Sequence, residues 1–489
     1  MPYPVNTGRV STGVEGLDEV LEGGLVPGRT YLISGLPGSG KTTIGWHYLV
    51  EGLKRGERVV YISFAEPEAE LRANAERSGF DAAGVDVLDL SPSADVFANA
   101  EAYDIFSPRE VESEPTTARI LETVRRVKPR RVFVDSMTHL RHLTTDAYQF
   151  RRQVLALLRF LAENGASVVV TSESTREAPD DDLRFITDGV IELGFGKRNR
   201  EIAVTKFRGS GFRGGMHALS LDRHGAKVFP RLIPETHRRA FEPHPLSSGI
   251  AEFDALLHGG IERGTVSLIS GPTGVGKTTL GIQLVVEAAR RGDSCVIYTF
   301  DERAETLIRR SEAVRIPVRA MIAAGKLRVV ELEALRFGPD EFANIVRRDV
   351  EERDTRIVMI DSVSGYRISV SDDLSERIHA LGRYLQNVGV TVLLIDELKD
   401  LLNFRVTDVG IRYLADNVIF LRYIERVSDG AVEIRRGIGV LKKRLSDFEK
   451  TVREFAITAS GVRIGPPLQL KSIFSNIPLT DDEPLVLPS

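Results

Sequence analysis

The chain has little cysteine and no long apolar run, and each shortage excludes a class of protein. A single cysteine, Cys295, rules out an intrachain disulfide framework of the kind that stabilises small secreted domains. Cys295 begins the apolar run 295–298, which predicts a small buried strand residue rather than a nucleophile. No apolar run approaches the roughly 18 residues of a membrane helix, and no basic-then-apolar leader opens the sequence. We therefore expect a cytoplasmic protein without membrane attachment.

An excess of one charge is also missing. The 65 Lys and Arg nearly balance the 69 Asp and Glu, so the formal net charge of −4 gives no overall attraction to nucleic acid or anionic lipid. What is present is a composition typical of globular domains, with 42% apolar and 27% charged residues. A length of 489 residues predicts two or more such domains.

A glycine-rich sequence occurs twice. Residues 35–42, Gly-Leu-Pro-Gly-Ser-Gly-Lys-Thr, and residues 271–278, Gly-Pro-Thr-Gly-Val-Gly-Lys-Thr, both fit the phosphate-binding pattern G-x-x-x-x-G-K-[ST], the P-loop. Each copy follows an apolar, strand-like run and opens an amphipathic, helix-like stretch. In that context backbone N–H groups and a helix N-terminus face the phosphates. The predicted nucleotide-binding residues are Gly38, Ser39, Gly40, Lys41, Thr42 and Thr43, and Gly274, Val275, Gly276, Lys277, Thr278 and Thr279.

The lysine and threonine that end each pattern predict that the loop binds a nucleotide together with Mg²⁺. Lys41 and Lys277 would reach the β- and γ-phosphates, while the hydroxyls of Thr42 and Thr278 would bind Mg²⁺. ATP and Mg²⁺ are therefore the expected ligands. The alternative is an ordinary glycine-rich turn, which the flanking strand and helix and the repetition make the weaker interpretation.

The repeat extends over the whole chain. Residues 11–18 match residues 247–254, and both this pair and the two P-loop lysines are separated by 236 positions (11 to 247, 41 to 277). A period this long indicates two whole domains. We expect a first domain at 1–236, a second at 237–470 and a tail at 471–489, with the boundary in the polar, proline-containing stretch 230–245.

Both halves alternate strands with helices. Continuous apolar strands alternate with helices in each half. This alternation predicts an α/β fold in which each of two tandem domains has a mainly parallel sheet flanked by helices. Short alternating segments such as 201–207 predict antiparallel edge strands, and catalytic groups are expected at the C-terminal ends of the parallel strands. The predicted strands are 59–64, 131–135, 166–171, 294–300, 356–361 and 391–396, and the predicted helices include 67–77, 150–161 and 374–386.

Carboxylates follow several of these strands. Asp135 and Asp361 each close an apolar strand and precede a serine, the arrangement of an aspartate that holds Mg²⁺ through water. An aspartate at a strand end can also be only a turn former. The P-loop upstream of each one favours the functional interpretation.

Hydrolysis also needs a carboxylate that orients or deprotonates water. Glu66 and Glu302 occupy equivalent positions after the strand that follows the P-loop helix, so each is our candidate general base and a candidate Mg²⁺ ligand. The alternative is an acid that stabilises a helix N-terminus. Asp301 adds a second candidate catalytic carboxylate, whereas Ala65 stands at the equivalent place in the first half.

Basic pairs occur late in both halves. Lys206 and Arg208 lie two apart on a predicted strand, and Lys442 and Arg444 recur at the corresponding place. They could stabilise charge on a transferring phosphoryl group. On the residues alone, a solvated surface pair is an equally good explanation.

Together these motifs resemble the KaiC family of circadian-clock ATPases. The resemblance runs from about Ser11 to about Ile464 and rests on the tandem P-loops, the T-G-V-x-G-L-D lead-in at 12–18, F-x-E at 64–66, V-D-S at 134–136 and K-x-R-G at 206–209. It implies a RecA-like fold in both halves and a homohexamer of two stacked rings with ATP between neighbouring subunits. The basic pairs would then reach the γ-phosphate bound by the adjacent protomer, and Ser210 would help hold that nucleotide.

The family also implies a Ser/Thr autokinase in the second ring, and here the sequence departs from it. The stretch 410–418 aligns with the segment in which clock members carry adjacent Ser and Thr acceptors, but this chain has Arg412 and Tyr413. Leu445 replaces the family's glycine after the second basic pair, and the tail from Pro466 to Ser489 shows little similarity.

Four functions remain open. We expect a KaiC-like ATPase that signals through nucleotide-dependent conformation, with a protein as signalling partner. The alternatives are a protein kinase, a RecA-like motor acting on nucleic acid, and a non-enzymatic scaffold held together by nucleotide. The motor would need a basic, aromatic-bearing channel, and the acidic net charge argues against nucleic acid as the partner.

Overall fold

The chain folds into two compact units, Met1–Arg231 and Leu232–Ser489. The computed structural model describes residues 8–91, 110–142, 147–174, 180–196, 199–333, 338–370, 374–397, 414–428 and 431–468. Residues Arg412 and Tyr413 and the tail at 471–489 lie outside the described residues. Each unit contains a nine-stranded sheet, and the strand order is the same in both: β3-β2-β4-β5-β1-β6-β7-β8-β9 and β14-β13-β15-β16-β12-β17-β18-β19-β20.

Six strands of the first sheet are parallel and three continue it in antiparallel pairing. This arrangement confirms the predicted fold class of a mainly parallel sheet with antiparallel strands at one edge. The parallel strands are β1 (Thr30–Gly35), β2 (Val59–Ser63), β3 (Asp86–Asp89), β4 (Arg131–Asp135), β5 (Ser167–Ser172) and β6 (Gly189–Phe195), and the antiparallel ones are β7 (Arg200–Phe207), β8 (His217–Asp222) and β9 (Gly225–Phe229).

The second sheet repeats this pairing. Its strands are β12 (Val266–Gly271), β13 (Ser294–Thr299), β14 (Leu327–Glu331), β15 (Thr355–Asp361), β16 (Thr391–Glu397), β17 (Asn417–Ser428), β18 (Ala431–Lys443), β19 (Arg453–Thr458) and β20 (Gly461–Pro467); a separate ribbon pairs β10 (Pro245–Leu246) with β11 (Ile261–Glu262). Cys295 is 2% exposed in β13, which confirms that it is a core residue.

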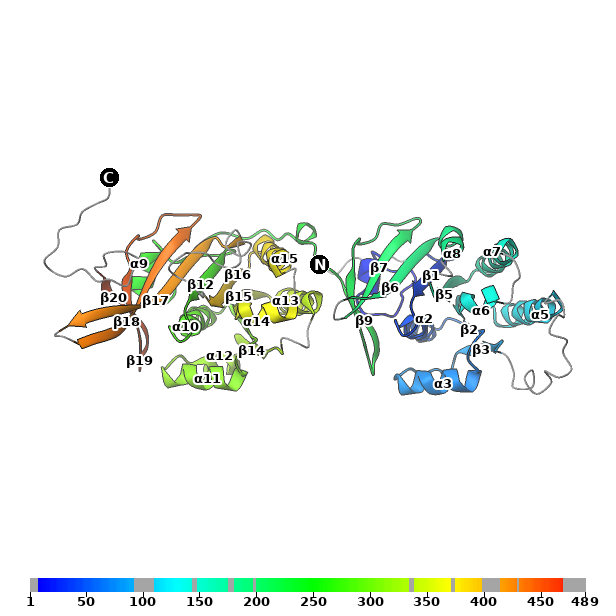
Figure 1. Cartoon of the computed structure of the whole chain (residues 1–489), viewed down its shortest axis with the longest axis horizontal. Helices are drawn as coiled ribbons and strands as arrows, with labels where there is room; N and C mark the ends of the chain where they lie inside the picture. The colour runs from blue at the N-terminus through cyan, green and yellow to red at the C-terminus, as the bar shows by residue number, and fades with distance from the viewer. Residues whose placement is uncertain are drawn as a thin grey trace. The chain divides into compact units, whose positions relative to one another are not determined.

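Helices cover both faces of each sheet, as Figure 1 shows. Each unit accordingly has two large apolar cores, one on either side of its sheet. The helices of the first unit are α1 (Leu17–Val20), α2 (Lys41–Lys54), α3 (Glu68–Arg77), α5 (Glu110–Val127), α6 (Met137–His142), α7 (Ala147–Glu163) and α8 (Asp181–Ile186). Those of the second are η1 (Pro234–Thr236), α9 (Ala251–Leu256), α10 (Lys277–Arg290), α11 (Ala304–Ala313), α12 (Val318–Ala323), α13 (Pro339–Arg353), α14 (Val363–Val370) and α15 (Leu374–Asn387).

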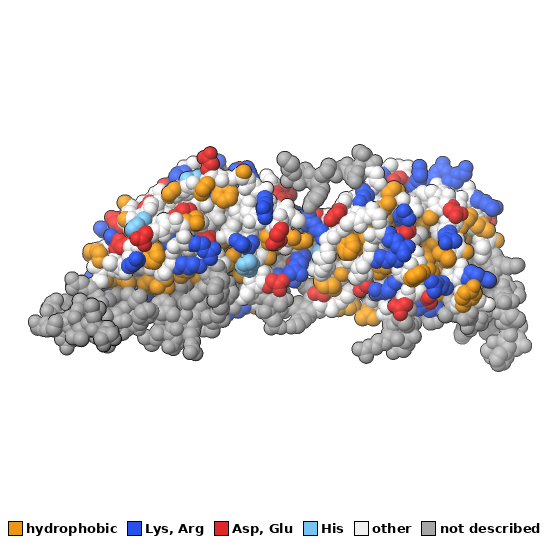
Figure 2. Space-filling model, turned by 90° about the horizontal axis from the view of Figure 1, so that it is seen from above, with side chains coloured by type: hydrophobic (Ala, Val, Ile, Leu, Met, Phe, Trp, Pro, Cys, Tyr) orange, Lys and Arg blue, Asp and Glu red, His pale blue; other side chains and the backbone are white. Residues whose placement is uncertain are grey.

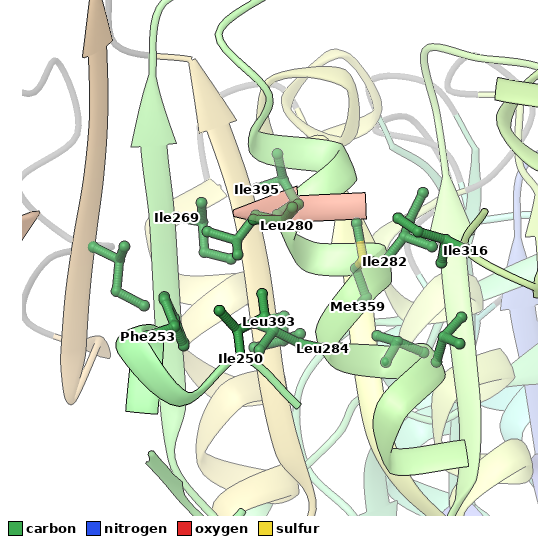
Figure 3. Packing of buried hydrophobic residues seen from close by; sticks show 14 of the residues in the cluster. Ile250, Phe253, Ile269, Leu280, Ile282, Leu284, Ile316, Met359, Leu393 and Ile395 are labelled. Atoms are coloured by element: carbon green, nitrogen blue, oxygen red, sulfur yellow. The ribbon is translucent and has the colours of Figure 1, made fainter. Parts of the chain in front are cut away.

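The helix after each P-loop is held on its sheet by aliphatic side chains. In the second unit, Leu280 and Leu284 of α10 gather with Ile269 of β12 and with Leu393 and Ile395 of β16 (Figure 3). Burying such side chains stabilises each by about 1.5–3 kcal/mol. The start of the helix is thereby fixed beside the C-terminal ends of the parallel strands. Among the described residues, no helix is long and apolar enough to cross a membrane.

Candidate functional site

The glycine-rich loops adopt a backbone that side chains disfavour. Gly38 and Gly40 have φ of +74° and +108°, and Gly274 and Gly276 have +77° and +112°. A Cβ on Gly40 would also lie 2.8 Å from Cδ1 of Leu221. Glycine is therefore required at Gly40, directly before α2, where the loop turns its backbone into the helix N-terminus. Each loop thus has a backbone that can turn N–H groups toward an anion at the start of the helix.

The P-loop lysines lie along their own loops. Nζ of Lys41 donates to the carbonyl oxygens of Gly35 (2.8 Å) and Leu36 (3.0 Å). Lys277 makes the same contacts with Gly271 (2.8 Å) and Pro272 (2.9 Å). Each ammonium group is thus positioned over the strand-to-helix turn.

Burial lowers the pKa of both lysine amines, and nearby carboxylates oppose that shift. The carboxylate that opposes the shift most is Glu173, directly after β5, for Lys41 and Glu397, the last residue of β16, for Lys277. We did not single out these glutamates from the sequence. The signal was present, since each comes at the end of a continuous apolar strand.

In the first unit, Asp135 is surrounded by hydroxyl groups. Its Oδ2 accepts hydrogen bonds from Oγ1 of Thr42 (2.7 Å) and from the hydroxyl of Tyr61 (3.0 Å). Its Oδ1 accepts one from Oγ1 of Thr171 (2.6 Å). The structure therefore brings together the threonine and the aspartate that the sequence predicts around Mg²⁺.

In the second unit, Asp361 has fewer hydroxyl neighbours. Thr278, the equivalent of Thr42, lies near enough to lower the pKa of its carboxyl group. The strand positions of Tyr61 and Thr171, however, are filled by Ile297 and Ile395, given the pairing of β13 and β16 with β15. Burial raises the pKa of Asp361 to about 6, with the hydrogen bond from Thr278 opposing the rise. The two pockets thus differ in how they hold the same carboxylate.

The candidate general bases follow β2 and β13 in matching turns. The backbone of Glu66 is held by Oγ of Ser63, which donates to its carbonyl oxygen (2.7 Å), and Oγ1 of Thr299 does the same for Glu302 (2.8 Å). Oε2 of Glu66 accepts from Nδ2 of Asn74 (3.3 Å). Glu302 instead forms an ion pair with Arg310 (3.0 Å).

Asp301 belongs to the second pocket. Its Oδ2 accepts a short hydrogen bond from Oγ of Ser362, the residue after Asp361. Phe300, just before Asp301, donates its backbone N–H to the carbonyl oxygen of Asp361 (2.8 Å). These contacts fix the Asp301 carboxylate next to the strand-end aspartate.

Other predicted residues have local roles. Val275 is buried in the apolar core, so only its backbone is available to a phosphate. Thr43 and Thr279 are half-buried in the first turns of α2 and α10. Oγ of Ser39 is buried without a hydrogen-bond partner.

The basic pairs lie away from the P-loops of their own units. Lys206 pairs with Val190, which is level with Leu32 near the start of β1, whereas the P-loop follows the end of β1. Nζ of Lys206 donates to carbonyl oxygens at the end of α8, including that of Arg184 (2.6 Å). The N–H of Arg208 donates to the carbonyl oxygen of Asp188.

The second unit repeats this placement. Lys442 pairs with Val418, which is level with Leu268 of β12, and its Nζ donates to the carbonyl oxygen of Ala415. Arg444 forms an ion pair with Asp416 (3.0 Å). The structure does not bring either basic pair to the P-loop of its own unit.

Ser210 lies just past Arg208 and outside any strand. Its Oγ donates to the carbonyl oxygen of Gly211 (3.0 Å) and accepts a hydrogen bond from Arg9. Like the basic pairs, it has partners within its own chain and none from the P-loop among the contacts of the described residues.

Comparison with known proteins identifies the family. The model of the family described as "ATPase: KaiC" matches residues 10–233 and again 246–469. The circadian clock protein KaiC3 of Synechocystis sp. is 29% identical over 479 residues, covering 94% of this chain and 92% of that protein. The circadian clock oscillator protein KaiC of Parasynechococcus marenigrum is 27% identical over 485 residues, covering 96% and 91%. With both sheets and both P-loops matched by one family, this chain belongs to the KaiC ATPase family and consists of two tandem RecA-like domains.

Proposed function

We propose that the chain binds ATP with Mg²⁺ in both pockets and hydrolyses it. The observation that carries the proposal is the hydrogen bond from Thr42 to Asp135 beside a glycine-framed loop, with Thr278 placed to act on the carboxyl group of Asp361 beside the second loop. A P-loop threonine and a strand-end aspartate are the residues that hold Mg²⁺ in P-loop enzymes. The match of the ATPase family over both halves supports the same function.

The phosphates would lie on the loop backbones. Residues 38–43 and 274–279 end the loops and form the first turns of α2 and α10. Their N–H groups lie at helix N-termini, where positive partial charge favours anions. Lys41 and Lys277 would exchange their loop carbonyls for the β- and γ-phosphates. The unpartnered Oγ of Ser39 fits a site that expects a further polar ligand.

Hydrolysis would proceed by attack of a water molecule on the γ-phosphorus. The new oxygen–phosphorus bond forms while the bond to the β,γ-bridging oxygen breaks, and ADP leaves with that electron pair. Glu66 in the first pocket and Glu302 in the second accept the proton of the attacking water. Asp301 adds a carboxylate at the second pocket alone.

The pockets suit Mg²⁺ only together with nucleotide. No group of three or more His, Cys, Asp or Glu in the described part of the chain could hold a metal ion by itself. Mg²⁺ sites of nucleotide enzymes commonly use one or two carboxylates and take the remaining ligands from phosphates and water. Thr42 and Thr278, with Glu66 and Glu302 as further candidates, would provide the protein ligands, and the ion would neutralise charge on the phosphates.

We further propose that each pocket is completed by a neighbouring protomer. Lys206 and Arg208 lie level with the start of β1, so they could reach a triphosphate at the end of β1 only in another subunit. The same holds for Lys442 and Arg444. A closed ring with head-to-tail contacts gives every subunit such a neighbour, and we propose a homohexamer of two stacked rings.

The relatives' names point to clock proteins, and for this chain we propose a signalling role in which a protein partner reads the nucleotide state. Acidic and basic side chains are interspersed on the face shown in Figure 2, which fits such a surface better than a continuous basic groove for nucleic acid. Kinase activity is the enzymatic alternative. Intact-mass analysis after incubation with ATP tests it: added phosphate would favour a kinase over simple hydrolysis.

Two measurements test the proposal. Calorimetric titration with ATP and Mg²⁺ should give binding that the double variant Lys41→Ala/Lys277→Ala loses, and the same variant should release no phosphate. Light scattering after size exclusion should show a mass about six times that of the protomer when ATP is present. Hydrolysis by the double variant, or a lone protomer saturated with ATP, would overturn the corresponding part.

A further inference from the structure

The two candidate bases have different partners on equivalent helices. α3 and α11 occupy the same place in the two units, and Asn74 and Arg310 are equivalent positions on them, 236 residues apart. Asn74 donates a long hydrogen bond to Glu66 (3.3 Å). Arg310 forms an ion pair with Glu302 (3.0 Å). A neutral amide therefore faces the base in the first pocket and a guanidinium faces it in the second.

The first helix also carries an arginine, but it acts one step further away. Arg77 donates to Oδ1 of Asn74 (2.6 Å), which turns the amide group of Asn74 toward Glu66. The equivalent of Arg77 in α11 is Ala313. Each helix thus has one arginine that acts on the candidate base. Arg77 acts on Glu66 through Asn74, whereas Arg310 contacts Glu302 directly.

The two pockets also differ in the number of carboxylates near the candidate base. The second pocket contains the additional carboxylate Asp301 where the first has Ala65. Charges of Asp301 and Glu302 act on Asp361, as does the opposing charge of Arg310. Arg310 therefore acts on two carboxylates of this pocket, Glu302 through the ion pair and Asp361 through its charge.

We propose that Arg310 is a positioning residue that holds the Glu302 carboxylate against α11 and makes the second pocket the slower of the two in ATP hydrolysis. The inference rests on the proposed hydrolysis at both pockets. To accept a proton from the attacking water, Glu302 must exchange a charged partner for that water, while Glu66 leaves only a long bond to an amide. The side chains are 48% and 25% exposed, so the pair is partly solvated and can open.

The test gives each candidate base the partner of the other one. Hydrolysis is measured in one pocket while the general base of the other pocket is replaced. In a Glu66→Gln background, which leaves the second pocket active, Arg310→Asn should raise kcat roughly two- to fivefold, the effect of losing a partly exposed ion pair. In a Glu302→Gln background, Asn74→Arg with Arg77→Ala should lower kcat of the first pocket by a similar factor. KM for ATP with Mg²⁺ should stay unchanged in both.

Three further variants and measurements separate positioning from other roles. Arg310→Lys keeps the cation and should retain the low kcat. Arg309→Asn removes the neighbouring arginine, which pairs with Glu305 (3.3 Å), and should leave kcat as it is. Calorimetric affinity for a non-hydrolysable ATP analogue with Mg²⁺ should not change with Arg310→Asn, because the arginine acts on the base and not on the nucleotide.

The outcomes distinguish this inference from the proposed function. A kcat that falls or stays constant with Arg310→Asn overturns the positioning role, and so does a loss of analogue affinity. A chain that hydrolyses no ATP in any background rejects the proposed function itself.

Discussion

Thr42 donates a hydrogen bond from Oγ1 to Oδ2 of Asp135 over 2.7 Å, which joins the first turn of α2 to the end of β4. The two residues are 93 positions apart in the sequence, so their contact depends on how closely α2 approaches β4. Gly45 of α2 sets that approach. A Cβ at this position would lie 2.1 Å from Cζ of the Phe133 ring, which is fully buried beneath the helix.

Gly45→Ala should therefore destabilise the first unit. The added methyl overlaps a rigid aromatic ring, and overpacking of this kind costs about 1–3 kcal/mol, more than the ~1 kcal/mol that alanine contributes over glycine in a helix. Urea unfolding followed by the fluorescence of Trp46, the single tryptophan and part of α2, measures the loss. ATP binding at the first pocket should weaken as well.

The equivalent glycine of the second unit provides the matched control. A Cβ on Gly281 would meet Cε of Met359 at 2.9 Å, the flexible end of a methionine that can move aside. Gly281→Ala is expected to change stability by less than about 1 kcal/mol. Equal losses in the two variants would contradict the role assigned to the Phe133 ring.

Replacing the candidate bases should separate hydrolysis from binding. Glu66→Gln and Glu302→Gln each keep the shape of the side chain but remove its capacity to accept a proton. Each should lower the turnover of its own pocket about 10²–10⁴-fold, the usual contribution of a general base. Phosphate release measures turnover, and calorimetry should show that nucleotide still binds. A double variant with undiminished phosphate release would exclude both glutamates.

If a neighbouring subunit donates the cation, rings assembled from two different inactive variants should regain activity. Lys41→Ala inactivates the P-loop of the subunit that carries it. Arg208→Ala removes the cation that a subunit donates to its neighbour. Each variant alone, with the second pocket silenced by Glu302→Gln, should be inactive. Mixed and reassembled, roughly one interface in four joins an intact loop to an intact cation, so partial activity should return. A mixture that stays inactive while forming mixed rings would contradict sharing between subunits.

Much of this architecture is local in the sequence, which explains why it could be predicted. The P-loops, the strands around them and the strand-end aspartates each depend on a short run of residues, and the repeat extends these assignments to the second half. The parallel pairing then follows, because continuous apolar strands need helices on both faces.

The partners of the catalytic carboxylates could not be predicted in this way. Tyr61 lies inside an apolar strand and gives no polar signal, yet its hydroxyl reaches Asp135 because β2 and β4 pair in a particular register. The polar stretch 230–245 gives no sign of packing in the sequence, yet the ring of His237 packs edge-on against Tyr384 of α15. Such contacts depend on register and on helix faces that only a three-dimensional structure defines.

Burial of Asp361 makes the stability of the nucleotide-free second unit depend on pH. Its pKa in the folded protein is about 6, while an unfolded aspartate titrates near 3.9. Between these values the folded state keeps a proton that the unfolded state has lost, so stability falls as pH rises from about 4 to about 6. The loss is at most about 3 kcal/mol, since each unit of pKa corresponds to 1.36 kcal/mol.

Asp361→Asn should remove this loss. The amide cannot become charged, so the free-energy cost of burying a carboxylate at this position disappears. The advantage of the variant over the natural protein should therefore grow from pH 4 to pH 6 and stay constant above. The ratio of hydrogen-exchange rates of β15 amides in the two proteins measures it, and unfolding of the first unit, read by Trp46, should not differ. A ratio independent of pH would contradict the assigned burial of the charge.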